Sequence, residues 1–176
     1  MKFRFVSFAA LAACVFSSPA LAWEQVERED GCGFYQGFEG PGNSFLYIRQ
    51  SKEMFDNDLI YIALSNDQWS LATGDAVGRM RFENDEGGWL ENDGVAVTNG
   101  FFISAPFEHV GNVFGSYYSG LVVYRDGKEI DNLSLSGAYL AWLEFKSCRG
   151  VWIAAKEKAE REQMLEEKYT GDPFAD

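Results

Sequence analysis

Residues whose types could do chemistry are few in this chain, and their spacing matches no catalytic motif. Histidine is the usual acid–base group or metal ligand near neutral pH, and His109 is the only one present. The segment 115–120, Gly-Ser-Tyr-Tyr-Ser-Gly, resembles the Gly-x-Ser-x-Gly nucleophile turn only superficially. The sequence contains no phosphate-binding glycine loop and no dinucleotide fingerprint. We therefore predict a protein that is not an enzyme, with no catalytic residues, no metal and no cofactor, and with His109 on the surface of a helix.

Carboxylates are abundant, with 27 Asp and Glu residues in the chain. A pair of carboxylates can hydrolyse a glycosidic bond, so a glycan-active hydrolase remains an alternative for which no residues can be nominated. Oxygen ligands also suit calcium, but segments 82–85 and 90–93, Phe-Glu-Asn-Asp and Leu-Glu-Asn-Asp, lack the calcium-loop spacing. Because Asn and Asp tolerate positive φ, we interpret both segments as hairpin turns.

Aromatic side chains suggest one kind of binding chemistry. Trp and Tyr combine an apolar ring with a polar edge, and on a β-sheet surface they can stack on sugar rings. The candidate ligand-stacking residues are Trp69, Trp89, Tyr117 and Tyr118. At strand and helix spacing, packing in the core is the alternative role for all four.

Three cysteines define the covalent chemistry. Cys14 would be removed with an export signal, which leaves Cys32 and Cys148. Two cysteines in an exported chain most often form a disulfide, since the compartment is oxidising. We predict that they pair and close a loop over most of the domain; the alternative is that both are free and buried.

Residues 1–22 have the pattern of a signal peptide. Lys2 and Arg4 precede a short apolar stretch, and Ala20-Leu21-Ala22 is a small-x-small cleavage pattern. The mature chain would then begin at Trp23. Leu11–Cys14 also has the form of a lipobox, so a lipoprotein attached through Cys14 is the alternative. No later segment approaches 18 apolar residues, and we expect a soluble periplasmic or secreted protein.

The net charge of the protein limits the classes of partner that it is expected to bind. The formal charge of −12 becomes −14 when residues 1–22 are removed, because they contain two basic and no acidic residues. A strongly acidic protein is not expected to bind nucleic acid or an anionic membrane surface. We expect the partner to be another envelope or secreted protein, or an envelope component. The charge also motivates an alternative function, inhibition of a basic envelope enzyme such as a lysozyme.

The strands and helices that must position the candidate residues are predicted from short apolar runs separated by Asn, Asp and Gly. We expect a mainly β (α+β) fold, an antiparallel sandwich or curved sheet of about eight strands. A helix over residues 106–118 and a second one ending near Cys148 should cover the sheet. Gly150 is expected to break or kink the chain. Residues 23–150 would form the disulfide-closed domain, and residues 151–176 a charged helical extension with an acidic tail.

The closing segment 133–148 carries a resemblance to a known family. Its pattern of Leu133, Leu135, Gly137 and Ala141 is similar to the end of the invasion-associated locus B family of periplasmic proteins, and it resembles small secreted alphaproteobacterial proteins. This resemblance implies an exported, β-rich domain, and it offers no catalytic residues to carry over to this chain.

Overall fold

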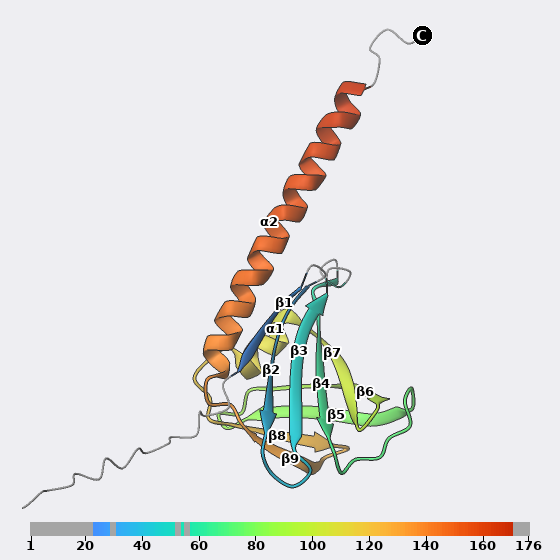
Figure 1. Ribbon diagram of the computed structural model, residues 1–176, viewed down its shortest axis with the longest axis vertical. Helices are drawn as coiled ribbons and strands as arrows, with labels where there is room; N and C mark the ends of the chain where they lie inside the picture. Colours follow the sequence, from blue (N-terminus) through green and yellow to red (C-terminus); the bar gives the residue numbers. More distant parts are fainter. Residues whose placement is uncertain (1–22, 29–30, 52–53, 55–56, 171–176) are drawn as a thin grey trace, which may run out of the picture.

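The structure is a computed structural model that describes residues 23–28, 31–51, 54 and 57–170 of the 176-residue chain (Figure 1). The predicted signal peptide at residues 1–22, the lipidation alternative at Cys14 and the predicted tail after Thr170 lie outside the described residues. Within the described part, no helix is long and apolar enough to cross a membrane.

Nine strands form one antiparallel sheet, which confirms the mainly β fold. Their order across the sheet is β1-β2-β3-β4-β7-β6-β5-β8-β9. The strands are β1 (Glu24–Arg28), β2 (Gly31–Phe38), β3 (Ser44–Ser51), β4 (Leu59–Asn66), β5 (Ala76–Asn84), β6 (Trp89–Val97), β7 (Gly100–Pro106), β8 (Gly120–Arg125) and β9 (Lys128–Ser134). Strand β1 was not predicted from the sequence, because its residues, Glu-Gln-Val-Glu-Arg, are mostly polar and contain no apolar run.

One of the two predicted hairpin turns is wrong. Asn84 does end β5 before a turn, but residues 90–93 lie inside β6. Opposite charges across the two strands favour the continuous strand, since Arg79 of β5 lies 2.7 Å from Glu91 and 4.0 Å from Asp93 of β6. Cross-strand pairs of this kind stabilise a sheet by roughly 0.2–1 kcal/mol each. They outweigh the local preference of Asn and Asp for a turn.

The sheet curls into a half-barrel, so that its two ends approach one another. Trp23, next to the first strand, donates a hydrogen bond from Nε1 to the carbonyl of Ser136 after the last strand, at 3.0 Å. Ser44 of β3 and Asp131 of β9 lie 2.5 Å apart through Oγ and Oδ2. The concave side is filled by side chains that alternate along the strands, and these are buried, as the alternation predicts.

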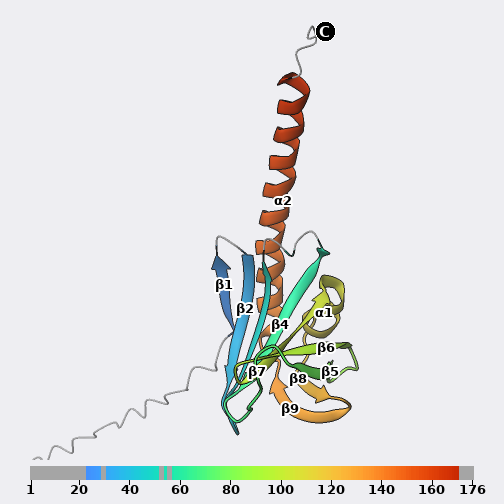
Figure 2. The ribbon, with the colours of Figure 1, turned by 90° about the vertical axis from the view of Figure 1, so that its right-hand side faces the viewer.

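Two helices close the concave side. Helix α1 (Phe107–Phe114) buries Val110, Val113 and Phe114. It is shorter than the predicted 106–118, because Pro106 precedes its first turn and Gly115 ends it with an N–H bond to the Gly111 carbonyl. Helix α2 (Ala138–Thr170) packs its first three turns on β1 and β2. Figure 2 shows both helices on the same side of β1, β2 and β4.

The predicted break at Gly150 is wrong. Helix α2 runs without interruption from Ala138 to Thr170, so the boundary predicted between residues 150 and 151 falls within one helix (Figures 1 and 2). A glycine in a helix costs only about 1 kcal/mol relative to alanine. Contacts of the two preceding residues hold the helix at this point, since Cys148 is bonded to Cys32 and Arg149 Nε donates to Gln50 at 2.9 Å. The second half of the helix projects from the domain, and its side chains from Ala154 to Glu166 are exposed.

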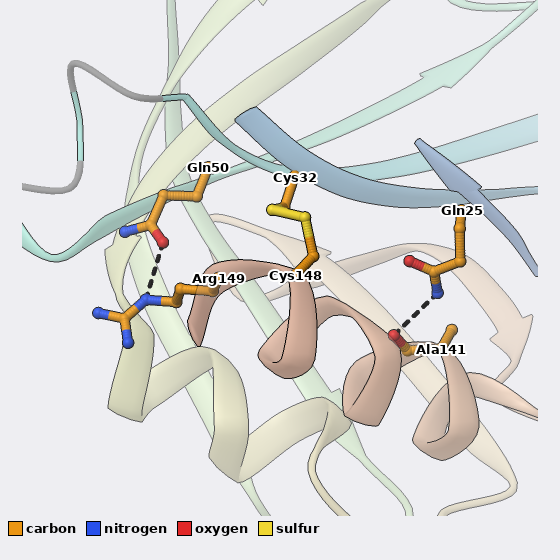
Figure 3. Close-up of a disulfide and its surroundings, with 6 residues drawn as sticks. All are labelled: Gln25, Cys32, Gln50, Ala141, Cys148 and Arg149. Carbon is orange, nitrogen blue, oxygen red and sulfur yellow. Dashed lines mark hydrogen bonds between the residues drawn. A yellow bond between two sulfur atoms is a disulfide. The ribbon is translucent and has the colours of Figure 1, made fainter. Parts of the chain in front are cut away.

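The predicted disulfide between Cys32 and Cys148 is confirmed (Figure 3). It joins β2 to the fourth turn of α2. Polar contacts flank it on both sides: Gln25 donates to the Ala141 carbonyl at 2.9 Å, and Arg149 Nε donates to Gln50 at 2.9 Å. The strand that leads into this helix, β9, pairs with β8, and Leu121 faces Leu133.

Candidate functional site

An open groove of about 840 Å³ lies between the β5–β6 turn and helix α1. One wall is formed by residues of the turn and the start of β6, and the other by residues of α1 and the segment that follows it. Its lining consists of Arg79, Glu86, Gly87, Gly88, Trp89, Leu90, Glu91, His109, Gly111, Asn112, Gly115 and Tyr118. Four of these residues are glycines, and a Cβ at Gly87 would meet no atom within 4 Å.

Two of the four predicted stacking aromatics, Trp89 and Tyr118, line this groove. Trp89 begins β6 with 53 % of its surface exposed, and Tyr118 lies half-buried on the opposite wall. The guanidinium carbon of Arg81 sits 5.0 Å from the centre of the Trp89 ring, in cation–π geometry. This contact holds the indole in place while much of its surface remains open to a ligand.

The polar lining supplies both donors and acceptors. Arg79 Nε donates to Glu91 Oε1 at 2.7 Å, and Arg79 Nη1 lies 4.0 Å from Asp93. The hydrogen bond that Arg79 donates to Glu91 raises the pKa of Arg79, and this side chain is a cation. The predicted surface position of His109 is confirmed, since it is exposed on α1 at the groove. Such a lining can bind hydroxyl, amide and carboxylate groups.

A buried asparagine fixes the two walls relative to one another. Asn84 is 3 % exposed, and its Nδ2 donates to the carbonyls of Asn112 at 3.0 Å and Val113 at 3.4 Å. Its Oδ1 accepts from the backbone N–H groups of Glu86 at 3.1 Å and Gly88 at 2.8 Å. All the hydrogen-bonding atoms of the amide are therefore used. The turn and the end of α1 are held as one unit, so the groove is preorganised.

The fit at Gly88 is close. A Cβ at this position would lie 2.4 Å from the Asn112 carbonyl and 2.7 Å from Asn84 Nδ2. Both values are far below van der Waals contact, and the nearest atom belongs to the backbone. Glycine is therefore required where the turn crosses α1, although the sequence offered no reason to single it out.

Asp85 provides a second clamp on the same turn. Its carboxylate accepts hydrogen bonds from the backbone N–H and the hydroxyl of Ser119, beyond α1. The hydrogen bond from the Ser119 side chain is the largest cause that lowers the pKa of Asp85. The clamp therefore depends on the ionised carboxylate.

This lowered pKa predicts a pH dependence. Ionised Asp85 contributes stability above the unfolded-state pKa of about 3.9, and this contribution is lost as pH falls through the lower native pKa. Urea denaturation at several pH values should show wild type more stable than Asp85→Asn near neutrality, with the difference shrinking in acid. The matched control is Asp67→Asn, an exposed aspartate in the β4–β5 loop. A difference that stays constant from pH 7 to pH 3 would contradict the clamp.

The other two predicted aromatics lie elsewhere. Tyr117 is 78 % exposed and contacts Tyr139 of α2 at 4.3 Å between ring centres. Trp69 stacks on buried Phe101 at 5.8 Å and lines a separate pocket of about 350 Å³. Trp69 therefore fits the alternative role, packing on the core, better than it fits ligand stacking. The four residues therefore do not form a single surface.

The structure also presents an aromatic surface that the sequence reasoning missed. Strands β2, β3, β4 and β7 carry, on their convex face, an aromatic band consisting of Tyr35, Phe45, Tyr47, Tyr61 and Phe102. Ring centres lie 5.1 Å apart for Tyr35–Phe45 and 5.3 Å apart for Tyr61–Phe102. The alternation of Phe45 and Tyr47 with buried Leu46 and Ile48 was the available signal. Tyr61 was not recognised as part of the band, because residues 59–64 form a continuous apolar run. Such a run gives no sign of which side chains face solvent.

No cluster of three or more His, Cys, Asp or Glu side chains suited to a metal occurs among the described residues. Comparison with protein-family models, with curated proteins and with solved structures finds no match to this chain. The function must therefore be argued from the groove itself. The resemblance of residues 133–148 to the invasion-associated locus B family stays a prediction.

Proposed function

We propose that this protein is a non-enzymatic binding protein of the bacterial envelope, and that its groove takes a sugar unit of an envelope glycan. The observation that carries the proposal is the placement of half-exposed Trp89 opposite Tyr118 in a groove that Asn84 holds rigid. An indole surface packs well against the apolar C–H face of a pyranose ring. The polar lining can then bind the hydroxyl and amide groups at the edge of the sugar.

Charge placement gives Glu91 a role in binding. Glu91, one of the two carboxylates that line the groove, accepts a 2.7 Å hydrogen bond from Arg79. Carboxylate oxygens can accept more than one hydrogen bond, so Glu91 can also accept from sugar hydroxyls.

The disulfide supports an exported location. Structural disulfides form and persist in oxidising compartments and are rare in the cytosol of mesophiles. Cys32, at 1 % exposure, and Cys148, which packs against the core, bond across 116 residues of sequence. Together with the signal-like residues 1–22, this bond argues for a periplasmic or secreted protein.

The test is binding of soluble glycans to the mature chain from Trp23. Isothermal titration with chitin oligosaccharides and muramidase-released peptidoglycan fragments should detect a complex with at least one of these two probes. Trp89→Ala should weaken it about tenfold or more, since an aromatic contact is worth about 0.5–1.5 kcal/mol beyond its buried area. Tyr117→Ala, at 78 % exposure outside the groove, is the matched control and should bind as wild type does.

Three outcomes would overturn this assignment. Unchanged affinity in Trp89→Ala would remove the groove as the site. Stoichiometric inhibition of a cationic lysozyme by the mature chain, equally strong in Trp89→Ala, would favour the inhibitor alternative that the net charge of −14 motivates. Release of reducing sugar from peptidoglycan by wild type would instead favour the hydrolase.

A further inference from the structure

A second pocket, of about 350 Å³, lies between the β4–β5 loop and the β8–β9 hairpin. Figure 1 shows the end of β4 and this hairpin at the end of the half-barrel away from the projecting half of α2. Small-molecule sites in proteins have volumes of about 300–1,000 Å³, so this pocket is at the lower end of that range. Its lining shares no residue with the groove at Trp89 and consists of Gln68, Trp69, Ser70, Leu71, Val77, Phe101, Arg125 and Ile130.

The apolar part of the lining comes from both the core and the loop. Val77 of β5 and Phe101 of β7 are buried. Trp69 of the loop packs on Phe101, with ring centres 5.8 Å apart and ring planes inclined by 22°. Leu71 and Ile130 are partly buried against the core beside them. This combination of flat rings and aliphatic side chains favours a small, flat and apolar ligand body, such as one aromatic ring.

The polar part of the lining carries one positive charge and no negative charge, although the chain has 27 acidic and 15 basic residues. Arg125 is the cation, and Gln68 and Ser70 are neutral. Among the described residues, the Arg125 side chain makes no hydrogen bond, and its one ion pair joins Nε to Asp126 Oδ2 at 3.9 Å. The Asp126 carboxylate is engaged by β5, since its Oδ1 accepts from the Arg79 backbone N–H at 2.9 Å. A guanidinium in this state can bind a carboxylate through two parallel hydrogen bonds.

A buried asparagine sets the position of the loop. Asn66 is 6 % exposed, and its Nδ2 donates to the Pro41 carbonyl at 3.1 Å and to Ser44 Oγ at 2.9 Å. Its Oδ1 accepts from the backbone N–H of Gln68 at 2.9 Å, and its carbonyl accepts from that of Trp69 at 2.9 Å. The loop is thereby tied to the β2–β3 turn. Because this wall of the pocket is already ordered, a ligand does not have to order it on binding.

We propose that this pocket is a binding site for a small aromatic monocarboxylate, a ligand with one flat ring and one carboxylate. The ring lies among the apolar side chains of the lining, and the carboxylate binds the exposed guanidinium of Arg125. A volume of 350 Å³ equals that of about a dozen water molecules, which suits one ring with a short acidic side chain. A stable protein interface would need about 800 Å² from each partner. This site does not rest on the function proposed for the groove.

Heteronuclear magnetic resonance of the isotope-labelled mature chain tests the site, with phenylacetate as the probe and phenylacetamide as its uncharged counterpart. Phenylacetate should shift the indole N–H signal of Trp69, which is assigned by its absence in Trp69→Phe, and should leave that of Trp89 unchanged. Phenylacetamide should bind about tenfold more weakly, because it lacks the charge that Arg125 recognises.

Arg125→Gln should weaken phenylacetate binding about tenfold and leave phenylacetamide binding unchanged, because only the carboxylate uses the guanidinium. Lys128→Gln is the matched control, since it removes one exposed cation of the same hairpin outside the pocket, and it should bind phenylacetate as wild type does. Unchanged positions of the remaining backbone signals show that each variant is folded.

The proposal is wrong if about 10 mM phenylacetate leaves the Trp69 signal of wild type unshifted. Equal affinity of wild type and Arg125→Gln for phenylacetate would overturn it as well, and so would equal affinity of wild type for phenylacetate and phenylacetamide, since either result removes the charge contact. Trp89→Ala, the groove variant, should bind phenylacetate as wild type does. Loss of phenylacetate binding in that variant would place the ligand in the groove and contradict the assignment.

Discussion

Replacing Cys148 with serine is expected to lower the free energy of unfolding of the mature chain by about 5 kcal/mol, because the Cys32–Cys148 bond closes a loop of 116 residues. In the chain-entropy description, the bond restricts the unfolded chain, and the restriction grows with the logarithm of loop length. Total stabilities of domains are about 5–15 kcal/mol. Loss of this one bond therefore brings the protein near the limit of folding.

Guanidinium denaturation of wild type and Cys148→Ser measures this effect, and addition of reductant to wild type should reproduce it. Ser147→Ala is the matched control, because it changes an exposed neighbour on α2 and leaves the bond intact. A shift below about 1 kcal/mol would mean that packing of α2 alone determines the position of this helix. The rings of Trp142 and Phe145, 5.4 Å apart on the buried face of α2, would then suffice.

Replacing Asn84 with alanine is expected to destabilise the protein by about 3 kcal/mol and to abolish measurable ligand binding in the groove. The variant leaves two carbonyls and two N–H groups of the groove walls without their partner. Each buried polar group left unsatisfied costs about 1–3 kcal/mol, and the groups nearer solvent cost less. The turn would then move independently of α1, and the ligand would have to order both walls on binding.

Thermal denaturation and titration with the soluble glycans test this expectation together. Asn92→Ala is the control, because Asn92 is exposed on the same hairpin. Its side chain donates to the Ser104 carbonyl and accepts from the neighbouring Asp93 N–H, so it does not join the two groove walls. Affinity in Asn84→Ala within twofold of wild type, at a temperature where the variant is folded, would show that the groove is not preorganised by this residue.

The sequence alone was sufficient to predict the mainly β fold and the disulfide between Cys32 and Cys148. Apolar residues at period two in β3, and Asn99-Gly100 and Asp126-Gly127 between strands, are local signals whose physical effect does not depend on distant residues. Asn99, Asp126 and Gly127 do adopt the positive φ that such turns require. With Cys14 assigned to the predicted signal peptide, Cys32 and Cys148 had only one intramolecular pairing available.

Only the tertiary structure decided where the elements end and which residues share a surface. Residues 90–93 lie in a strand because Arg79 and Arg81 stand opposite their acidic side chains, and Gly150 lies within a helix whose preceding turns are anchored to β2. The groove depends on contacts between residues 28 positions apart, such as Asn84 and Asn112. The aromatic band depends on the register of four strands. Neither is a property of any short segment, so composition and periodicity could name Trp89 and Tyr118 but could not bring them together.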